Sequence, residues 1–292
     1  MHSPLPVLAL LFNALVWGLS WWPFRSMHAA GLHPLWATAL MYALMLLGLL
    51  GLRPGALGPL LRHPGLWLLA LSSGLNNVAF NWAVTVGDVV RVILLFYLMP
   101  AWAVLLAWRL LGERPTPQAL LRLLLAFGGV VLVLLPPEAS WQSLVSHLSM
   151  ADGLALFGGF MFALTNVLLR RLNDVPGPSR MLAMFAGCVA MGLLSALAGS
   201  AAGVVPGFPA WNATWAGLAL GMALLLMVGN GALQFGATRL PSGTTALVLL
   251  SEVAFASLSS LLLTSATLPL RTVLGGTLIL LAALLAALQR RR

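Results

Sequence analysis

The 292 residues of the chain are 61% hydrophobic and only 7% charged, whereas soluble globular domains carry about 25% charged residues. This composition excludes a soluble fold and indicates an integral membrane protein. All 15 basic residues are arginines, and the formal net charge is +9. The arginines interrupt apolar runs and form no basic face with interleaved aromatic residues, so we expect a lipid bilayer as partner and no nucleic acid.

Ten apolar stretches follow one another along the chain, and a membrane helix needs about 20 such residues. Glycine, proline and charged residues separate the stretches. The predicted spans are 4–24, 35–52, 65–86, 89–111, 117–135, 150–170, 180–203, 213–238, 242–264 and 269–289. The first span lacks the basic start and the cleavage site of a signal peptide, so we expect it to stay in the mature protein.

The distribution of arginine predicts the orientation of these spans. Loops numbered alternately from the N-terminus collect twelve arginines on one side, and the other side receives only Arg25, Arg91 and Arg271. Because cytoplasmic loops are enriched in basic residues, both termini are expected in the cytoplasm, with the protein in a bacterial inner membrane. Arg91 is expected to form a local ion pair with Asp88.

Matched polar pairs indicate an internal repeat. Asn77 and Asn81 lie four residues apart in the third span, and Asn230 and Gln234 lie four apart in the eighth. In both cases 153 residues separate the counterparts, and this offset takes Pro100 to Val253.

Five spans per half require that the second half inserts upside down. The predicted fold is therefore an all-α integral membrane protein with ten transmembrane helices in two inverted five-helix repeats. It forms one domain over residues 1–292, with repeat one at about 1–140 and repeat two at about 150–292. The third, fourth, eighth and ninth spans are expected to build most of a central cavity, joined by the first and sixth.

One segment of the first half carries a recognisable pattern. An apolar helix with a central Pro100 leads into the turn Leu-Gly-Glu-Arg-Pro-Thr-Pro at 111–117, and an apolar helix with Gly128-Gly129 follows. Together with Trp17-Gly18 in the first span, this segment resembles the drug/metabolite transporter superfamily, in its ten-helix EamA-like branch. The second half departs from the pattern, since Val253 replaces the proline and Ala266 the glutamate.

Within that superfamily the sequence is most similar to aromatic amino-acid exporters. The resemblance implies a secondary transporter that moves small metabolites out of the cell by alternating access. Since few residues hold charge inside the spans, we expect a neutral or zwitterionic substrate, such as an amino acid. Export of organic cations or drugs is the alternative, and an intramembrane enzyme is less favoured.

Polar groups inside a membrane are costly and mark functional sites. Carboxamides offer both donors and an acceptor, which suits a zwitterion, although they also bind neighbouring helices. Glu252 is expected to recognise an ammonium group or carry a proton, unless it is a neutral acid bonded to Ser251 or a neighbouring helix. The expected polar substrate-binding residues are Asn77, Asn81, Asn230, Gln234, Ser251 and Glu252.

Aromatic residues near the middle of spans are candidates for stacking on the substrate. These are Trp17, Phe80, Tyr97 and Phe157, and for each of them except Tyr97 plain packing is favoured over contact with the substrate. Tyr97 is favoured because Pro100, three residues later, removes a backbone donor from the helix.

A catalytic site is not expected. Ser143, His147 and Asp152 are the residue types of a hydrolytic set, but no Gly-x-Ser-x-Gly motif accompanies them. We predict no catalytic residues, no cofactor and no bound metal. The sequence does not specify an oligomeric state, and a monomer is compatible with the predicted architecture.

Overall fold

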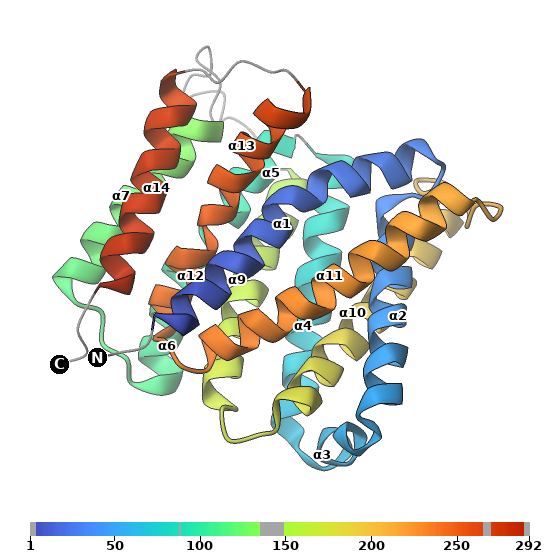
Figure 1. Ribbon diagram of the computed structural model, residues 1–292, viewed down its shortest axis with the longest axis horizontal. Coiled ribbons are helices and arrows are strands. Elements are labelled where there is room, and N and C mark those ends of the chain that lie inside the picture. Colours follow the sequence, from blue (N-terminus) through green and yellow to red (C-terminus); the bar gives the residue numbers. More distant parts are fainter. Residues whose placement is uncertain (1–3, 88, 135–148, 265–269, 289–292) are drawn as a thin grey trace.

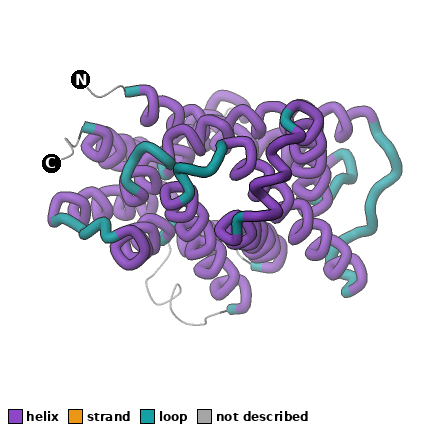
Figure 2. The backbone as a smooth tube through the Cα atoms, turned by 90° about the horizontal axis from the view of Figure 1, so that it is seen from below, coloured by secondary structure: helices purple, strands orange, loops and turns teal. Residues whose placement is uncertain are grey.

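The computed structural model describes residues 4–87, 89–134, 149–264 and 270–288, and these ranges are built from helices joined by short connections (Figures 1 and 2). The helices are α1 Leu5–Ala29, α2 Pro34–Leu52, the 3-10 helix η1 Pro54–Ala56, α3 Leu57–Arg62, α4 Pro64–Val86, α5 Val89–Phe96, α6 Met99–Leu111, α7 Pro117–Leu134, α9 Met150–Arg171, α10 Gly177–Ala201, α11 Ala213–Ala237, α12 Ser242–Leu249, α13 Ser251–Thr264 and α14 Leu270–Ala287. The polar segment predicted between the fifth and sixth spans, with Ser143 and His147, lies outside the described residues.

Helix ends follow local sequence signals. The side chains of His33 and His63 accept hydrogen bonds from the backbone N–H groups of Leu35 and Gly65 at the starts of α2 and α4. Both helices have proline at a first position, where its missing N–H costs nothing. Gly112 ends α6 in the left-handed conformation, with φ of 71°.

Every predicted span coincides with helix, but the fourth and ninth are each broken in two. Seven helical segments of the described residues are long and apolar enough to cross a membrane, and α7 and α14 are shorter apolar helices. Helix α4 is outside both groups, and it carries three asparagines and two serines. The chain is therefore an all-helical integral membrane protein.

Each half packs chiefly against the other half. Helix α1 lies along α11 and crosses α12 and α13, while α4 lies along α9, which also contacts α5 and α6. Helices α7 and α14 form a pair at one edge, next to both termini (Figure 1). The long neighbours α4 and α10 come so close that a Cβ on Gly187 would overlap the carbonyl oxygen of Ala70.

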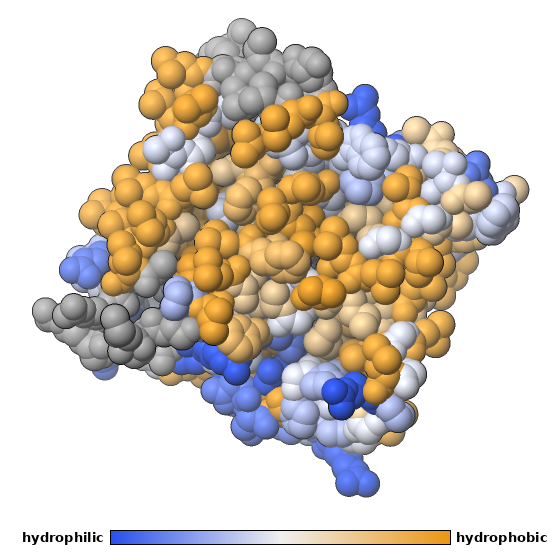
Figure 3. Space-filling model, viewed as in Figure 1, coloured by the Kyte–Doolittle hydropathy of each residue, from blue (hydrophilic) through white to orange (hydrophobic). Residues whose placement is uncertain are grey.

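The outer surface is strongly apolar. A broad hydrophobic area crosses the middle of the face in Figure 3, with hydrophilic residues towards its edges. Large side chains on the outside of α10 and α11, such as Leu194 at 60% and Val228 at 62% exposure, contribute to this surface. Such a surface is stable in lipid and would aggregate in water.

The break in the fourth span depends on Pro100 and on a glycine of α9. Pro100 has no N–H to donate to the carbonyl of Phe96, the residue four positions earlier. A Cβ built on Gly159 would lie 2.6 Å from that carbonyl oxygen, so the bare glycine of α9 covers the freed group. The ninth span has no proline at its break. There the hydroxyl of Ser251 donates to the carbonyl of Val248 at 2.7 Å, and hydrogen bonds of this kind bend helices.

We predict that Gly159→Ala destabilises the protein by about 1–3 kcal/mol, because the methyl group forces α9 away from the Phe96 carbonyl. Gly153→Ala in the same helix is the control, since a Cβ there meets nothing within 4 Å and alanine favours helix. Thermal unfolding in detergent measures both variants. Equal midpoints for the two variants would contradict the role given to Gly159.

Candidate functional site

The two broken spans are joined at their breaks. The hydroxyl of Tyr97, between α5 and α6, donates a hydrogen bond of 2.5 Å to Oε1 of Glu252, in the first turn of α13. Tyr97 is 7% exposed, and Glu252 is partly buried. Two residues that the sequence singled out in different halves therefore form one polar group inside the bundle.

Helix α1 closes against this group. A Cβ on Gly18 would lie 2.8 Å from the carbonyl oxygen of Glu252, so the absent side chain allows the contact. About two turns further along α13, Ser259 accepts a hydrogen bond from the indole N–H of Trp21 at 2.9 Å. Trp17 is partly buried and packs against the main hydrophobic core. Gly18 therefore allows close packing of α1 on α13, a contact that the sequence analysis did not predict.

Aromatic rings lie beside Tyr97. The ring of Phe96 is 6.0 Å from that of Tyr97, 4.7 Å from Phe80 and 5.9 Å from Phe162, measured between centroids. Phe80 was expected in the site, whereas Phe96 and Phe162 were not. Phe157 is 40% exposed, which suits a lipid-facing side chain better than a cavity wall.

Three of the four carboxamides, Asn77, Asn81 and Gln234, bind neighbouring helices. Asn77 donates to the sulfur of Cys188 on α10 at 3.2 Å, and Asn81 donates to the hydroxyl of Thr38 on α2 at 3.1 Å. Asn230 is 4% exposed, and its side-chain oxygen has no hydrogen-bond partner among the described residues. Asn230 therefore keeps a buried acceptor that no described residue satisfies.

Gln234 holds a buried arginine in place. Its side-chain oxygen accepts from Nε of Arg180 at 3.1 Å, and Arg180 also donates to the carbonyls of Leu172 and Val175. The same contacts fix the connection between α9 and α10. The side-chain bonds of Gln234 thus go to α10. Ser251, fully buried, is the first residue of α13 and donates to Val248 of α12 across the break.

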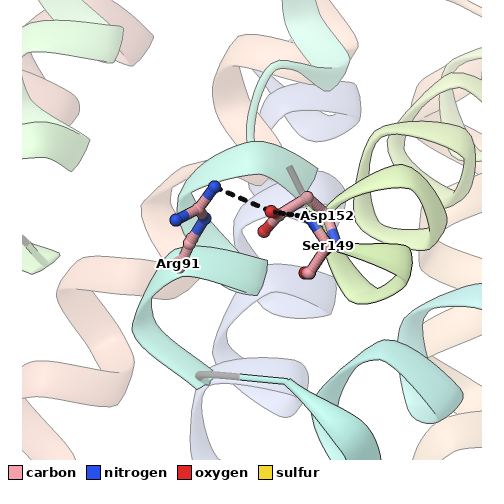
Figure 4. A network of polar contacts seen from close by, with 3 residues as sticks. All are labelled: Arg91, Ser149 and Asp152. Carbon is pink, nitrogen blue, oxygen red and sulfur yellow. Dashed lines mark hydrogen bonds and ion pairs between the residues drawn. The ribbon is translucent and has the colours of Figure 1, made fainter. Parts of the chain in front are cut away.

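An ion pair ties α5 to the start of α9 (Figure 4). Arg91 lies 2.7 Å from Oδ2 of Asp152, which is 2% exposed. Asp152 also forms a reciprocal capping box with Ser149, which stabilises the first turn of α9. The sequence predicted a local pair with Asp88, which lies outside the described residues, and it missed the partner on α9.

A second ion pair lies at the other end of α9. Arg170 Nε is 3.6 Å from Glu113 Oε1, and Glu113 Oε2 accepts the backbone N–H of Ser242 at the start of α12. Since α9 has 22 residues and rises about 1.5 Å per residue, about 30 Å separates the two pairs. Both pairs join the first half of the chain to the second.

A cleft of about 1990 Å³ opens beside Glu113, at the end where both termini lie. Ends of α1, α6, α7, α9, α12 and α14 form its walls, and it extends to Leu247, near the end of α12. Helices α4 and α11 contribute no lining residue. The expected first, fourth, sixth and ninth spans thus line this cleft, the fifth and tenth join them, and the third and eighth do not.

Comparisons with known proteins agree with this architecture. Residues 4–135 match the model of the EamA-like transporter family, which confirms the family recognised from the first-half motifs. The matched residues correspond to the predicted first repeat. No curated protein matches the chain.

The fold as a whole has solved counterparts. One, described only as the crystal structure of a protein, has a TM-score of 0.77 and 20% sequence identity, and the alignment covers 96% of each chain. At this identity the likeness shows the fold alone. The chain is an integral membrane protein, and its residues 4–135 match the EamA-like transporter family.

We predict that Gln234→Leu lowers stability by about 1–3 kcal/mol, because the buried guanidinium of Arg180 loses an acceptor. Asn81→Leu is the comparison, since it removes an amide bonded to a neutral hydroxyl, and we expect a loss below about 1 kcal/mol. The thermal unfolding midpoints of the two purified variants measure both losses of stability. A larger loss for Asn81→Leu would contradict the structural role assigned to Gln234.

Proposed function

We propose that the protein is a secondary transporter that exports small neutral or zwitterionic metabolites, above all amino acids including aromatic ones. The observation that carries this proposal is the bond between Tyr97 and Glu252 at the breaks of two helices. Broken helices inside a membrane are typical of transporter binding sites. A carboxylate there can bind an ammonium group, and the rings around Phe96 can stack on an apolar or aromatic side chain.

We further propose ten spans in two inverted halves. Moved forward by 153 residues, the bounds of α5 become those of α12, and the bounds of α7 become those of α14. The packing supports the same exchange, because α1 on α11 corresponds to α9 on α4. Rocking of the halves around the site would then expose it to each side in turn.

The described conformation suits the access expected of an exporter loaded from the cytoplasm. The cleft opens at the end that holds both termini, and the Arg91–Asp152 pair joins the halves at the opposite end. Glu252 does not line the cleft, and a solute would reach it past Leu247. Both ion pairs are formed in this conformation while the cleft is open, so opening the opposite end requires the Arg91–Asp152 pair to break.

Organic cations or drugs are the second candidate class. A carboxylate beside several aromatic faces also suits a cation without a carboxylate of its own. Uptake into liposomes, compared between aromatic amino acids and aromatic amines, distinguishes the two classes. Stabilisation by the solute without its chemical conversion would distinguish both from an enzyme.

We predict from the arginine distribution that a cysteine introduced beside Arg62 or Arg171 is labelled by an impermeant reagent only from the cytoplasm. A cysteine at position 143 should be labelled only from outside. Replacing Cys188 first removes the native thiol, which is buried. The reverse labelling pattern would contradict the proposed orientation, and labelling of all sites from one side would contradict the inverted halves.

We predict that Glu252→Gln weakens apparent affinity for amino acids about tenfold or more in proteoliposomes, both with and without a pH gradient, because the amide cannot pair with an ammonium group. If Glu252 instead carries the coupling proton, exchange at equal pH should persist and only the response to the gradient should disappear. A variant with both fluxes intact would remove Glu252 from the site.

The two tyrosines of the chain provide a matched comparison for this experiment. Tyr97→Phe removes the hydroxyl that positions Glu252 and should weaken affinity in the same direction. Tyr42→Phe alters a buried hydroxyl next to Asn77 and Cys188 instead. If only Tyr42→Phe weakens affinity, the substrate binds at the carboxamides and not at Glu252.

A further inference from the structure

The cleft at the terminal end gathers positive charge from both halves of the chain. Among the described residues that line it, four are arginines and one is acidic. The first half contributes Arg114 and Arg122, and the second half contributes Arg170 and Arg239. The four arginines belong to segments that are far apart in the sequence and meet around this cleft only in the folded bundle.

Backbone carbonyls and an aromatic ring hold three of these guanidinium groups in place, those of Arg122, Arg170 and Arg239. Arg122, only 6% exposed, donates to the carbonyl of Leu285, and Arg170 donates to that of Thr238. Arg239 lies 3.9 Å above the ring of Phe235 and donates to the carbonyl of the same residue. Carbonyls and rings orient a guanidinium group and leave its formal charge in place, which preserves its attraction for an anion.

A carboxylate of the chain already occupies part of this environment. One oxygen of Glu113 lies 3.6 Å from Nε of Arg170, and the other accepts the backbone N–H of Ser242 at 3.1 Å. The cleft wall therefore supplies a guanidinium and a backbone donor suited to a planar oxyanion. Its volume of about 1990 Å³ leaves room for a further group.

We propose that this cleft binds an oxyanion, a carboxylate or a phosphate, between the arginines of the two halves. The anion has two possible sources, a free solute or the headgroup of an anionic phospholipid. The general enrichment of arginine at one membrane face accounts for the number of charges at this end. It does not account for their convergence on a cleft, and Arg53 and Arg62, assigned to the same face, do not line it.

The test uses two cleft variants and one control of the purified full chain. Arg114→Gln with Arg239→Gln removes two exposed charges from the cleft, so this double variant is expected to fold. Arg122→Gln removes the buried charge. Arg53→Gln with Arg62→Gln removes two exposed charges away from the cleft and matches the double variant in net charge.

Binding is read as the thermal unfolding midpoint in nanodiscs. In the first arm, phosphatidylcholine discs are titrated with inorganic phosphate or acetate at constant ionic strength. In the second arm, phosphatidylglycerol replaces part of the lipid and no phosphate or acetate is added. Both arms measure binding at equilibrium, so their outcome is independent of whether the protein transports amino acids.

We expect at least one arm to stabilise the wild-type chain, with apparent affinity about tenfold or more lower in the double cleft variant and unchanged in the control. Stabilisation by phosphate or acetate identifies a free solute, and stabilisation by phosphatidylglycerol alone identifies a lipid headgroup. Loss of the response in Arg122→Gln adds the buried arginine to the site. No response in either arm, or an equal response in the double cleft variant and the control, overturns the proposal.

Discussion

Backbone groups that leave a helix inside a membrane have no water to bind, and this constraint governs the centre of the molecule. Pro100 frees the carbonyl of Phe96, and Gly159 of α9 covers it. Ser251, at the start of α13, donates to the carbonyl of Val248 in α12, across the second break. Because both breaks are packed inside the bundle, the side chains beside them, Tyr97 and Glu252, can face each other in place of lipid. The polar group at the centre is therefore a consequence of how the breaks are buried.

The sequence predicted the helical class and singled out Tyr97 and Glu252 for clear physical reasons, but it did not predict the break in the ninth span. Apolar length identifies membrane helices directly, and proline and an intramembrane acid stand out against an apolar background. Phe96, Phe162 and Gly159 were missed because their roles depend on a neighbouring helix. The chain has many phenylalanines and glycines, and nothing in the sequence around any one of them indicates which helix will pack against it.

The carboxamides also show that the sequence does not reveal which helix a side chain will contact. Their spacing of four residues correctly places each pair on one helix face, but spacing says nothing about what that face meets. Gln234 meets Arg180, a residue assigned to the membrane surface, because the side chain turns inward to the carbonyls of Leu172 and Val175. Asn77 meets the thiol of Cys188. A polar side chain in a membrane helix therefore has two possible uses, and the neighbouring helix decides between them.

Helix α9 connects these features into one mechanical element. At its start Asp152 binds Arg91, and at its end Arg170 binds Glu113, so the first half holds it at both ends. Between them, Gly159 lies against the break of the fourth span, and the ring of Phe162 lies beside that of Phe96. A tilt of α9 that separates one terminal pair must also shift its contact with the broken span. The ends of the bundle are thereby coupled to the group formed by Tyr97 and Glu252, through packing at glycine and not through a continuous chain of charges.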